Sequence, residues 1–208
     1  CSPGTGAYLD LWAVTPDGRQ WRQLTHYASA VRTARFPETP AGALIPRFSS
    51  NGNKIVWAEM IGYDEKHPFG LWRLALADFV DDAEGPHLAS KVTATPGSWG
   101  TTFYEAWGFS PDDASITVAS ESGARHPAFM DVQLFRPATG KLVNLTRTKR
   151  ELEEQAVFSP DGLRIAFMST RGQSPRYDPG HDFWGTFRTD VWLMGTDGTG
   201  WQRLTHFN

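Results

Sequence analysis

Apolar residues along the chain form short consecutive runs that are separated by tight turn signals. The stretch FSPDGLRIAFMSTRG, from Phe158 to Gly172, joins an aromatic residue, a Ser-Pro-Asp-Gly turn and the apolar run LRIAFMS. Proline presets φ at the second position of such a turn and glycine takes the positive φ that closes it, so the stretch predicts a β-hairpin. Because the run is consecutive and rich in β-branched and aromatic residues, we expect its strand to be covered on both faces.

This hairpin signal recurs along the chain. Near-copies begin at Phe48 (FSSNGNKIVWAEMIG) and at Phe109 (FSPDDASITVASESG), and a second hairpin unit follows each copy and also opens the chain. The second unit starts at Asp10, Gly70, Asp131 and Asp190, which lie 60, 61 and 59 residues apart. A fixed period of this size is typical of a repeat architecture, here with four antiparallel strands in each period.

Four strands per repeat, with no helix expected, predict an all-β fold. We expect a β-propeller of four-stranded antiparallel blades, with about three and a half blades present. The predicted single domain, residues 1–208, consists of a half-blade at 8–26 and blades at roughly 44–95, 103–147 and 154–206. Repeated aromatic residues are expected to fill the gaps between blades: Phe48, Phe109, Phe158, Trp57, Trp72, Trp107 and Trp192.

An open propeller of this size has two consequences. It would leave unpaired strand edges and a large apolar blade face. We therefore expect either that the chain is the first part of a longer protein or a truncated piece, or that its open blade edges support self-association.

The repeat resembles a known family. FSPDG…IAF followed by DVWLMGTDGTGWQRLTH is similar to the TolB-type propeller repeat, a WD-like class with a Pro-Asp-Gly motif, over most of the chain from Asp10 to His206. The first copy departs from the motif at residues 50–52, the second at Asp113, and Gln133 stands where Trp is expected. The resemblance implies either an envelope interaction platform or an accessory domain of a peptidase.

Composition and charge narrow the possible partners. The net charge is −3, which argues against a nucleic-acid partner because such proteins present a concentrated basic surface. No apolar run approaches the ~20 residues of a membrane-spanning helix.

Cys1 is the only cysteine of the chain. Bacterial lipoproteins begin with a lipid-bearing cysteine, so Cys1 is a candidate lipidation site and lipid anchor. That reading places the protein in the periplasm or cell envelope. The alternatives are an arbitrary chain start or a free thiol.

Loop lengths point to one face of the propeller as the binding surface. The loops between second and third strands are long, at residues 61–69, 121–130 and 171–188, whereas most turns at the other end are tight. Extra loop length on a rigid scaffold is where binding residues concentrate. Candidate partner-binding residues on these loops are Tyr177, His181, Asp182, Phe183, Trp184, His67 and His126. Three histidines can hold a metal. We favour the simpler interpretation that they are ordinary solvated loop residues, and we predict neither a metal nor a cofactor.

No catalytic signature is present in the sequence, neither a G-x-S-x-G elbow, an H-E-x-x-H pair nor a P-loop. We therefore predict a noncatalytic TolB-like propeller that acts as a protein-interaction or ligand-binding platform, with a protein partner. The alternative is the accessory propeller domain of a larger enzyme, either a prolyl oligopeptidase-like serine peptidase or a propeller-type polysaccharide lyase.

Overall fold

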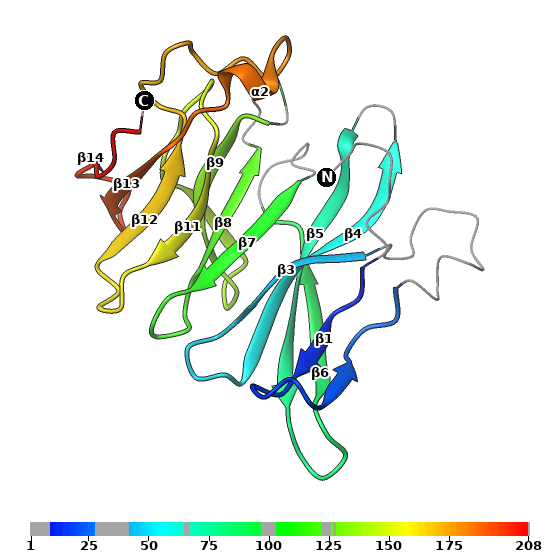
Figure 1. The fold of residues 1–208 in the computed structure, drawn as a ribbon. Coiled ribbons are helices and arrows are strands. Elements are labelled where there is room, and N and C mark those ends of the chain that lie inside the picture. Colours follow the sequence, from blue (N-terminus) through cyan, green and yellow to red (C-terminus); the bar gives the residue numbers. More distant parts are fainter. Residues whose placement is uncertain are drawn as a thin grey trace. The chain divides into compact units, whose positions relative to one another are not determined.

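The fold was analysed in a computed structural model. It describes residues 9–27, 42–64, 67–96, 103–121, 126 and 128–207, except for the side chains of residues 63, 64 and 67–69. This part of the chain contains a two-stranded hairpin and three four-stranded antiparallel sheets (Figure 1). The chain is therefore all-β and has the architecture of a partial β-propeller, as the repeat predicts. It divides into two compact units, Cys1–Thr95 and Pro96–Asn208, which we describe separately.

The first unit contains the opening hairpin and one sheet. The hairpin consists of β1 (Trp12–Val14) and β2 (Trp21–Gln23). The sheet has the order β3 (Gly42–Phe48), β4 (Lys54–Asp64), β5 (His67–Val80) and β6 (His87–Ala94). The prediction of a long loop at residues 61–69 is wrong. The strands β4 and β5 continue through this region and pair as far as Asp64 and His67, because bulges in the ladder accommodate the extra residues.

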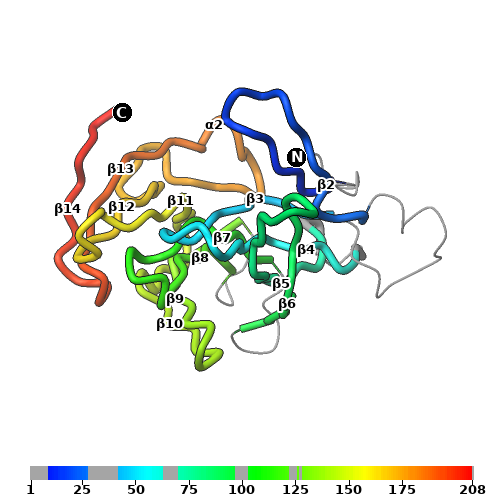
Figure 2. The backbone as a smooth tube through the Cα atoms, turned by 90° about the horizontal axis from the view of Figure 1, so that it is seen from below, coloured from blue at the N-terminus to red at the C-terminus, as the bar shows by residue number. Residues whose placement is uncertain are grey.

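The second unit contains two sheets of the same topology. One has the order β7 (Tyr104–Phe109), β8 (Ile116–Glu121), β9 (Met130–Arg136) and β10 (Lys141–Asn144). The other has the order β11 (Glu153–Phe158), β12 (Arg164–Ser169), β13 (Asp190–Gly195) and β14 (Gln202–Arg203). Figure 2 shows the two sheets diverging, with β7 and β11 near each other and β10 and β14 far apart.

Side-chain hydrogen bonds explain the repeated Ser-Pro-Asp-Gly turn. Ser159 donates its hydroxyl to Asp161 across 2.5 Å, and the same hydroxyl accepts the amide of Arg164 across 3.0 Å, which closes the hairpin. Gly162 has the predicted positive φ of 72°. Ser110 and Asp112 repeat this arrangement in the turn between β7 and β8. The motif thus specifies turn geometry through local bonding rather than through composition alone.

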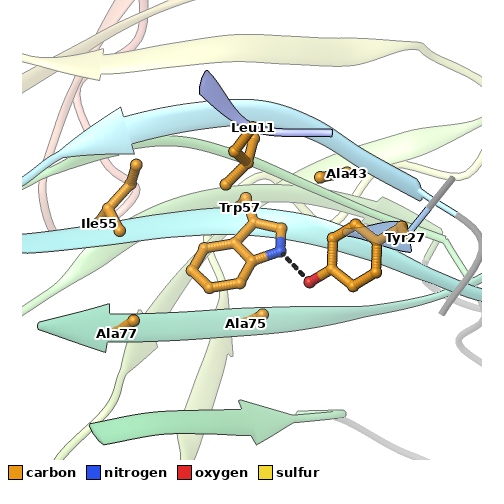
Figure 3. Close-up of a cluster of buried hydrophobic side chains, with 7 residues drawn as sticks. All are labelled: Leu11, Tyr27, Ala43, Ile55, Trp57, Ala75 and Ala77. Atoms are coloured by element: carbon orange, nitrogen blue, oxygen red, sulfur yellow. Dashed lines mark hydrogen bonds between the residues drawn. The ribbon is translucent and has the colours of Figure 1, made fainter. Parts of the chain in front are cut away.

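Trp57 lies at the centre of the core of the first unit (Figure 3). Its indole is fully buried and donates Nε1–H to the hydroxyl of Tyr27 across 3.2 Å. The surrounding core residues are Leu11, Ala43, Ile55, Ala75 and Ala77. Leu11 precedes β1, so packing against Trp57 attaches the opening hairpin to the sheet.

The core of the second unit joins its two sheets. Val132 and Leu134 of β9 pack in one cluster with Ile165 and Phe167 of β12. Phe158 and Trp192 pack against this cluster, as expected for residues between blades. Phe48 of the first unit differs, because it is 53% exposed and contacts Phe79 of its own sheet edge-on.

Candidate binding site

Two long loops meet at one end of the second unit. Residues 121–130 join β8 to β9 and residues 171–188 join β12 to β13, at the end opposite the tight turns (Figure 1). The second loop contains a one-turn helix, α2 (Phe183–Thr186), where the sequence predicts none. The helix forms because Asp182 caps it, accepting the amide of Gly185 across 2.9 Å. This predicted contact residue therefore has a local structural role.

Tyr177 is the centre of an aromatic cluster in this loop. It contacts Phe129, Phe183 and Phe187 edge-on, with ring centroids 5.7, 5.9 and 6.1 Å apart. Only 3% of Tyr177 is exposed, because the surrounding rings cover most of it. Its predicted contact with a partner stays a prediction. Trp184 is 82% exposed and lies on the outside of the cluster.

A surface hollow of about 450 Å³ lies beside this cluster. Its lining residues are His126, Phe129, Arg150, Arg176, Tyr177, Asp178, Pro179, Gly180 and His181. They come from both long loops and from the connection between β10 and β11. The hollow therefore brings together three of the predicted contact residues, Tyr177, His126 and His181.

The charged groups of the hollow differ in their pairing. His181 contacts Asp178 across 3.2 Å, and Arg176 contacts Glu151 across 3.5 Å. Among the described residues, the guanidinium of Arg150 has neither an ion-pair nor a hydrogen-bond partner. Two guanidinium groups thus border an aromatic wall, an arrangement that can bind an anionic group.

The three candidate histidines lie in different surroundings. His126 accepts the amide of Ala128 at Nδ1 across 3.1 Å, and burial lowers its pKa although the charge of Asp178 opposes this. The side chain of His181 is 89% exposed. His67 is the first residue of β5 in the first unit, and its side chain is outside the described part. Across the described residues, no group of three or more metal-ligating side chains is found.

Two buried carboxyl groups lie on neighbouring inner strands of the second unit. Glu105 on β7 is hydrogen-bonded to Glu154 on β11, and burial together with the charge of Glu154 raises the pKa of Glu105 to about 9. Burial also raises the pKa of Glu154. Burial and the charge of Glu154 also raise the pKa of Tyr177.

The sequence contains a pattern that could have predicted this carboxyl pair, although we did not identify either glutamate as a candidate. Glu105 and Glu154 each precede a repeated phenylalanine, Phe109 or Phe158, by four positions. They therefore occupy equivalent positions of the repeat, and in the same unit such positions face similar surroundings.

A buried ionic group in the first unit has a structural role. Glu59 of β4 is fully buried, contacts Arg73 across 2.6 Å and also binds Lys91 and the hydroxyl of Tyr27. Every member is paired within its own sheet or with the adjoining segment. The candidate lipidation residue, Cys1, lies outside the described residues.

Comparisons with known proteins support the fold. No family model matches the sequence, and no curated protein matches it. Similar solved structures include an oligogalacturonate lyase in complex with manganese (TM-score 0.55, 13% identity), a nidogen/laminin complex (0.54, 9%) and a puromycin hydrolase mutant complexed with PGG (0.52, 17%). At these identities the likeness shows the propeller fold alone.

The chain spans only part of each of these proteins. The aligned region covers 94% of this chain and 50% of the lyase, 96% and 58% for the nidogen/laminin structure, and 88% and 23% for the puromycin hydrolase. In the described part, no helix is long and apolar enough to cross a membrane.

Proposed function

We propose that this chain is a noncatalytic propeller module that binds a protein or ligand through the loop end of its second unit. The observation that carries the proposal is the hollow beside Tyr177, which both long loops line. Loops on a rigid sheet scaffold can differ in sequence without altering the core, so this end suits recognition. The TolB-like character of the module is part of the proposal.

Exposed aromatic surface next to the hollow favours a protein partner. Trp184 is 82% exposed although it contacts Phe183 and Phe187 at its base. Tryptophan and arginine are enriched where protein interfaces carry most of their binding energy. The loop between β12 and β13 carries both residue types, Trp184 on the outside of the aromatic cluster and Arg176 in the lining of the hollow.

Trp184→Ala tests this proposal with little risk to the fold, because the side chain is mostly exposed. We expect the variant to lose capture of a defined partner from envelope extract, identified by comparing captured proteins between wild type and variant. Leu163→Ala is the matched control, since Leu163 is 68% exposed in the tight turn at the opposite end. Equal capture by Trp184→Ala and wild type would contradict the choice of this face.

Replacing residues 176–187 with a short Gly-Ser turn is the harsher test. It removes buried Tyr177 as well as exposed Trp184, so native β-sheet circular dichroism must be checked first. Loss of fold would mean that the loop acts as a cover for the sheets.

The second candidate function is that of an accessory propeller in a larger enzyme, either a prolyl oligopeptidase-like serine peptidase or a polysaccharide lyase. The structures of a puromycin hydrolase and an oligogalacturonate lyase favour it, because this chain aligns with a part of each. The full open reading frame separates the two candidates. A nucleophile elbow beyond the repeats would support the enzyme, whereas further blades and a stop would support the binding module.

An envelope location is the last part of the proposal. It depends on Cys1 as a lipidated residue, so the native protein should partition into detergent and Cys1→Ser should be released as a soluble species. A precursor without a signal peptide ahead of Cys1 would exclude it.

A further inference from the structure

We infer that the hollow beside Tyr177 binds a carboxylate carried on an apolar or aromatic body, such as an acidic residue next to an apolar one. The inference rests on the proposed function, because it concerns the same end of the second unit. It adds the chemistry of the group that binds there.

The charges of the lining residues favour an anion. Arg150 has no charged partner among the described residues, and Arg176 reaches Glu151 only at 3.5 Å with most of its side chain exposed. Among the described lining residues, Asp178 is the only carboxylate, and His181 contacts it at 3.2 Å. A ligand carboxylate can therefore bind two guanidinium groups that keep most of their donors available.

The aromatic wall favours an apolar body behind that carboxylate. Phe129 and Tyr177 both line the hollow and pack edge-on, so they present ring surface to it. Phe129 is half-buried, and its ring also contacts the ring of His126 edge-on. Apolar ligand surface that packs against these rings is removed from water, and this transfer has a favourable free energy.

The hydroxyl of Tyr177 is the independent indication of a ligand. This oxygen is buried and has no hydrogen-bond partner among the described residues, although the side chain lines the hollow. Burial and the charge of Glu154 raise the pKa of Tyr177, so the hydroxyl keeps its proton and remains a donor. A ligand carboxylate would satisfy a donor that the protein leaves unpaired.

The carboxyl pair near Tyr177 could oppose an anion, and its protonation limits this effect. Glu105 keeps its proton at neutral pH, because burial and Glu154 raise its pKa to about 9. The pair therefore carries at most one negative charge there. Among the described residues, neither Glu105 nor Glu154 forms an ion pair with Arg150 or Arg176, and Arg176 pairs with Glu151 instead.

Three small probes with one shared body test the inference. Phenylpropionate, phenylpropanol and phenylpropylamine differ only in whether the head group is anionic, neutral or cationic, and each is titrated against the isotope-labelled chain by amide NMR. We expect phenylpropionate to bind most tightly. Arg150→Gln and Arg176→Gln should each weaken it roughly three- to tenfold, since each removes one charge-assisted contact.

Two further variants locate the bound probe. Tyr177→Phe keeps the ring packing and should also weaken phenylpropionate, whereas Arg164→Gln, at the start of β12 near the opposite turns, should not. Equal or tighter binding of the amine would overturn the charge class. Binding that neither Arg150→Gln nor Arg176→Gln weakens would overturn the site.

The outcome also separates this inference from the proposed function. If no probe binds while Trp184→Ala still abolishes capture of a partner, the face is correct and the carboxylate inference is wrong. If phenylpropionate binds as expected while Trp184→Ala captures the same partners as wild type, the inference stands for a small ligand and the protein-partner proposal fails.

Discussion

Asp131 accepts a hydrogen bond from the hydroxyl of Thr146 across 3.1 Å, which joins the start of β9 to the segment after β10. The same carboxylate oxygen accepts the amide of Thr148, and the Thr146 hydroxyl accepts the amide of Val132 across 3.0 Å. Equivalent pairs are Asp190 with Thr205 and Asp10 with Thr25. Each pair joins the start of a repeat's third strand (β1, β9 or β13) to the segment that follows its fourth strand (β2, β10 or β14).

Thr146→Val should therefore destabilise the second unit. Valine keeps the shape but leaves the buried Asp131 carboxylate without one donor and the Val132 amide without an acceptor. We expect the free energy of unfolding in urea to fall by about 1 to 3 kcal/mol. The control Thr139→Val, in the exposed turn before β10, should leave it unchanged. Similar unfolding of both variants would contradict the structural role of the pair.

The aspartate–threonine pair shows how far the sequence alone could lead. The sequence shows a repeated pattern from which the period and the fold follow. Its repeats start at Asp10, Asp131 and Asp190 and share a Leu-Thr pair near each end. The bonding of aspartate to threonine does not follow from this pattern, because it joins residues about fifteen positions apart across a hairpin. The remaining repeat has Gly70 in place of the aspartate, with φ at 87°.

The candidate site was predictable in position but not in detail. Loop length correctly placed residues 171–188 at one end of the sheets, since loop position follows from strand order. Burial of Tyr177 depends on three rings that converge on it from two loops, which no local pattern encodes. The equivalent repeat positions of Glu105 and Glu154 are readable in the sequence, but only the folded unit shows that their two strands become neighbours.

Gly162 and Gly198 offer a matched test of turn geometry. Both have positive φ, at 72° and 83°, but a Cβ on Gly162 would meet Pro111 at an ordinary 3.5 Å, whereas one on Gly198 would lie 2.7 Å from the Leu145 carbonyl oxygen. Gly162→Ala should cost about 1 kcal/mol of backbone strain, and Gly198→Ala roughly 2 to 4 kcal/mol because steric overlap adds to it. Urea unfolding measures both. Equal costs would show that the backbone at Gly198 moves freely.

Glu59 provides a test in the first unit. Burial raises its pKa, but hydrogen bonds from Lys91, Tyr27 and Arg73 outweigh this and lower it, so the carboxylate is charged. Glu59→Gln leaves two cations without their buried partner and should cost roughly 3 kcal/mol of stability. Asp78→Asn, which removes the exposed ion pair with Lys54, is the control and should change little. A small effect of Glu59→Gln would contradict the assignment of the charge.

The pH dependence of stability tests the buried carboxyl pair. Burial and Glu154 raise the pKa of Glu105 to about 9, and burial raises that of Glu153 to about 8. An unfolded glutamate titrates near ~4.3, so the folded state binds protons more tightly. The resulting stability is fully present below about pH 4 and is lost as the pH rises through the two folded values.

The free energy of unfolding should consequently fall by roughly 6 kcal/mol between pH 6 and pH 9, with more than half of this from Glu105, as measured by urea titration at each pH. Glu105→Gln stays neutral at both values and keeps a hydrogen bond to Glu154. We expect it to match wild type at pH 6 and to exceed it at pH 9. Glu84→Gln, in the exposed turn between β5 and β6, should follow wild type throughout. Wild-type stability that stays level or rises toward pH 9 would mean that Glu105 is ionised in the folded protein.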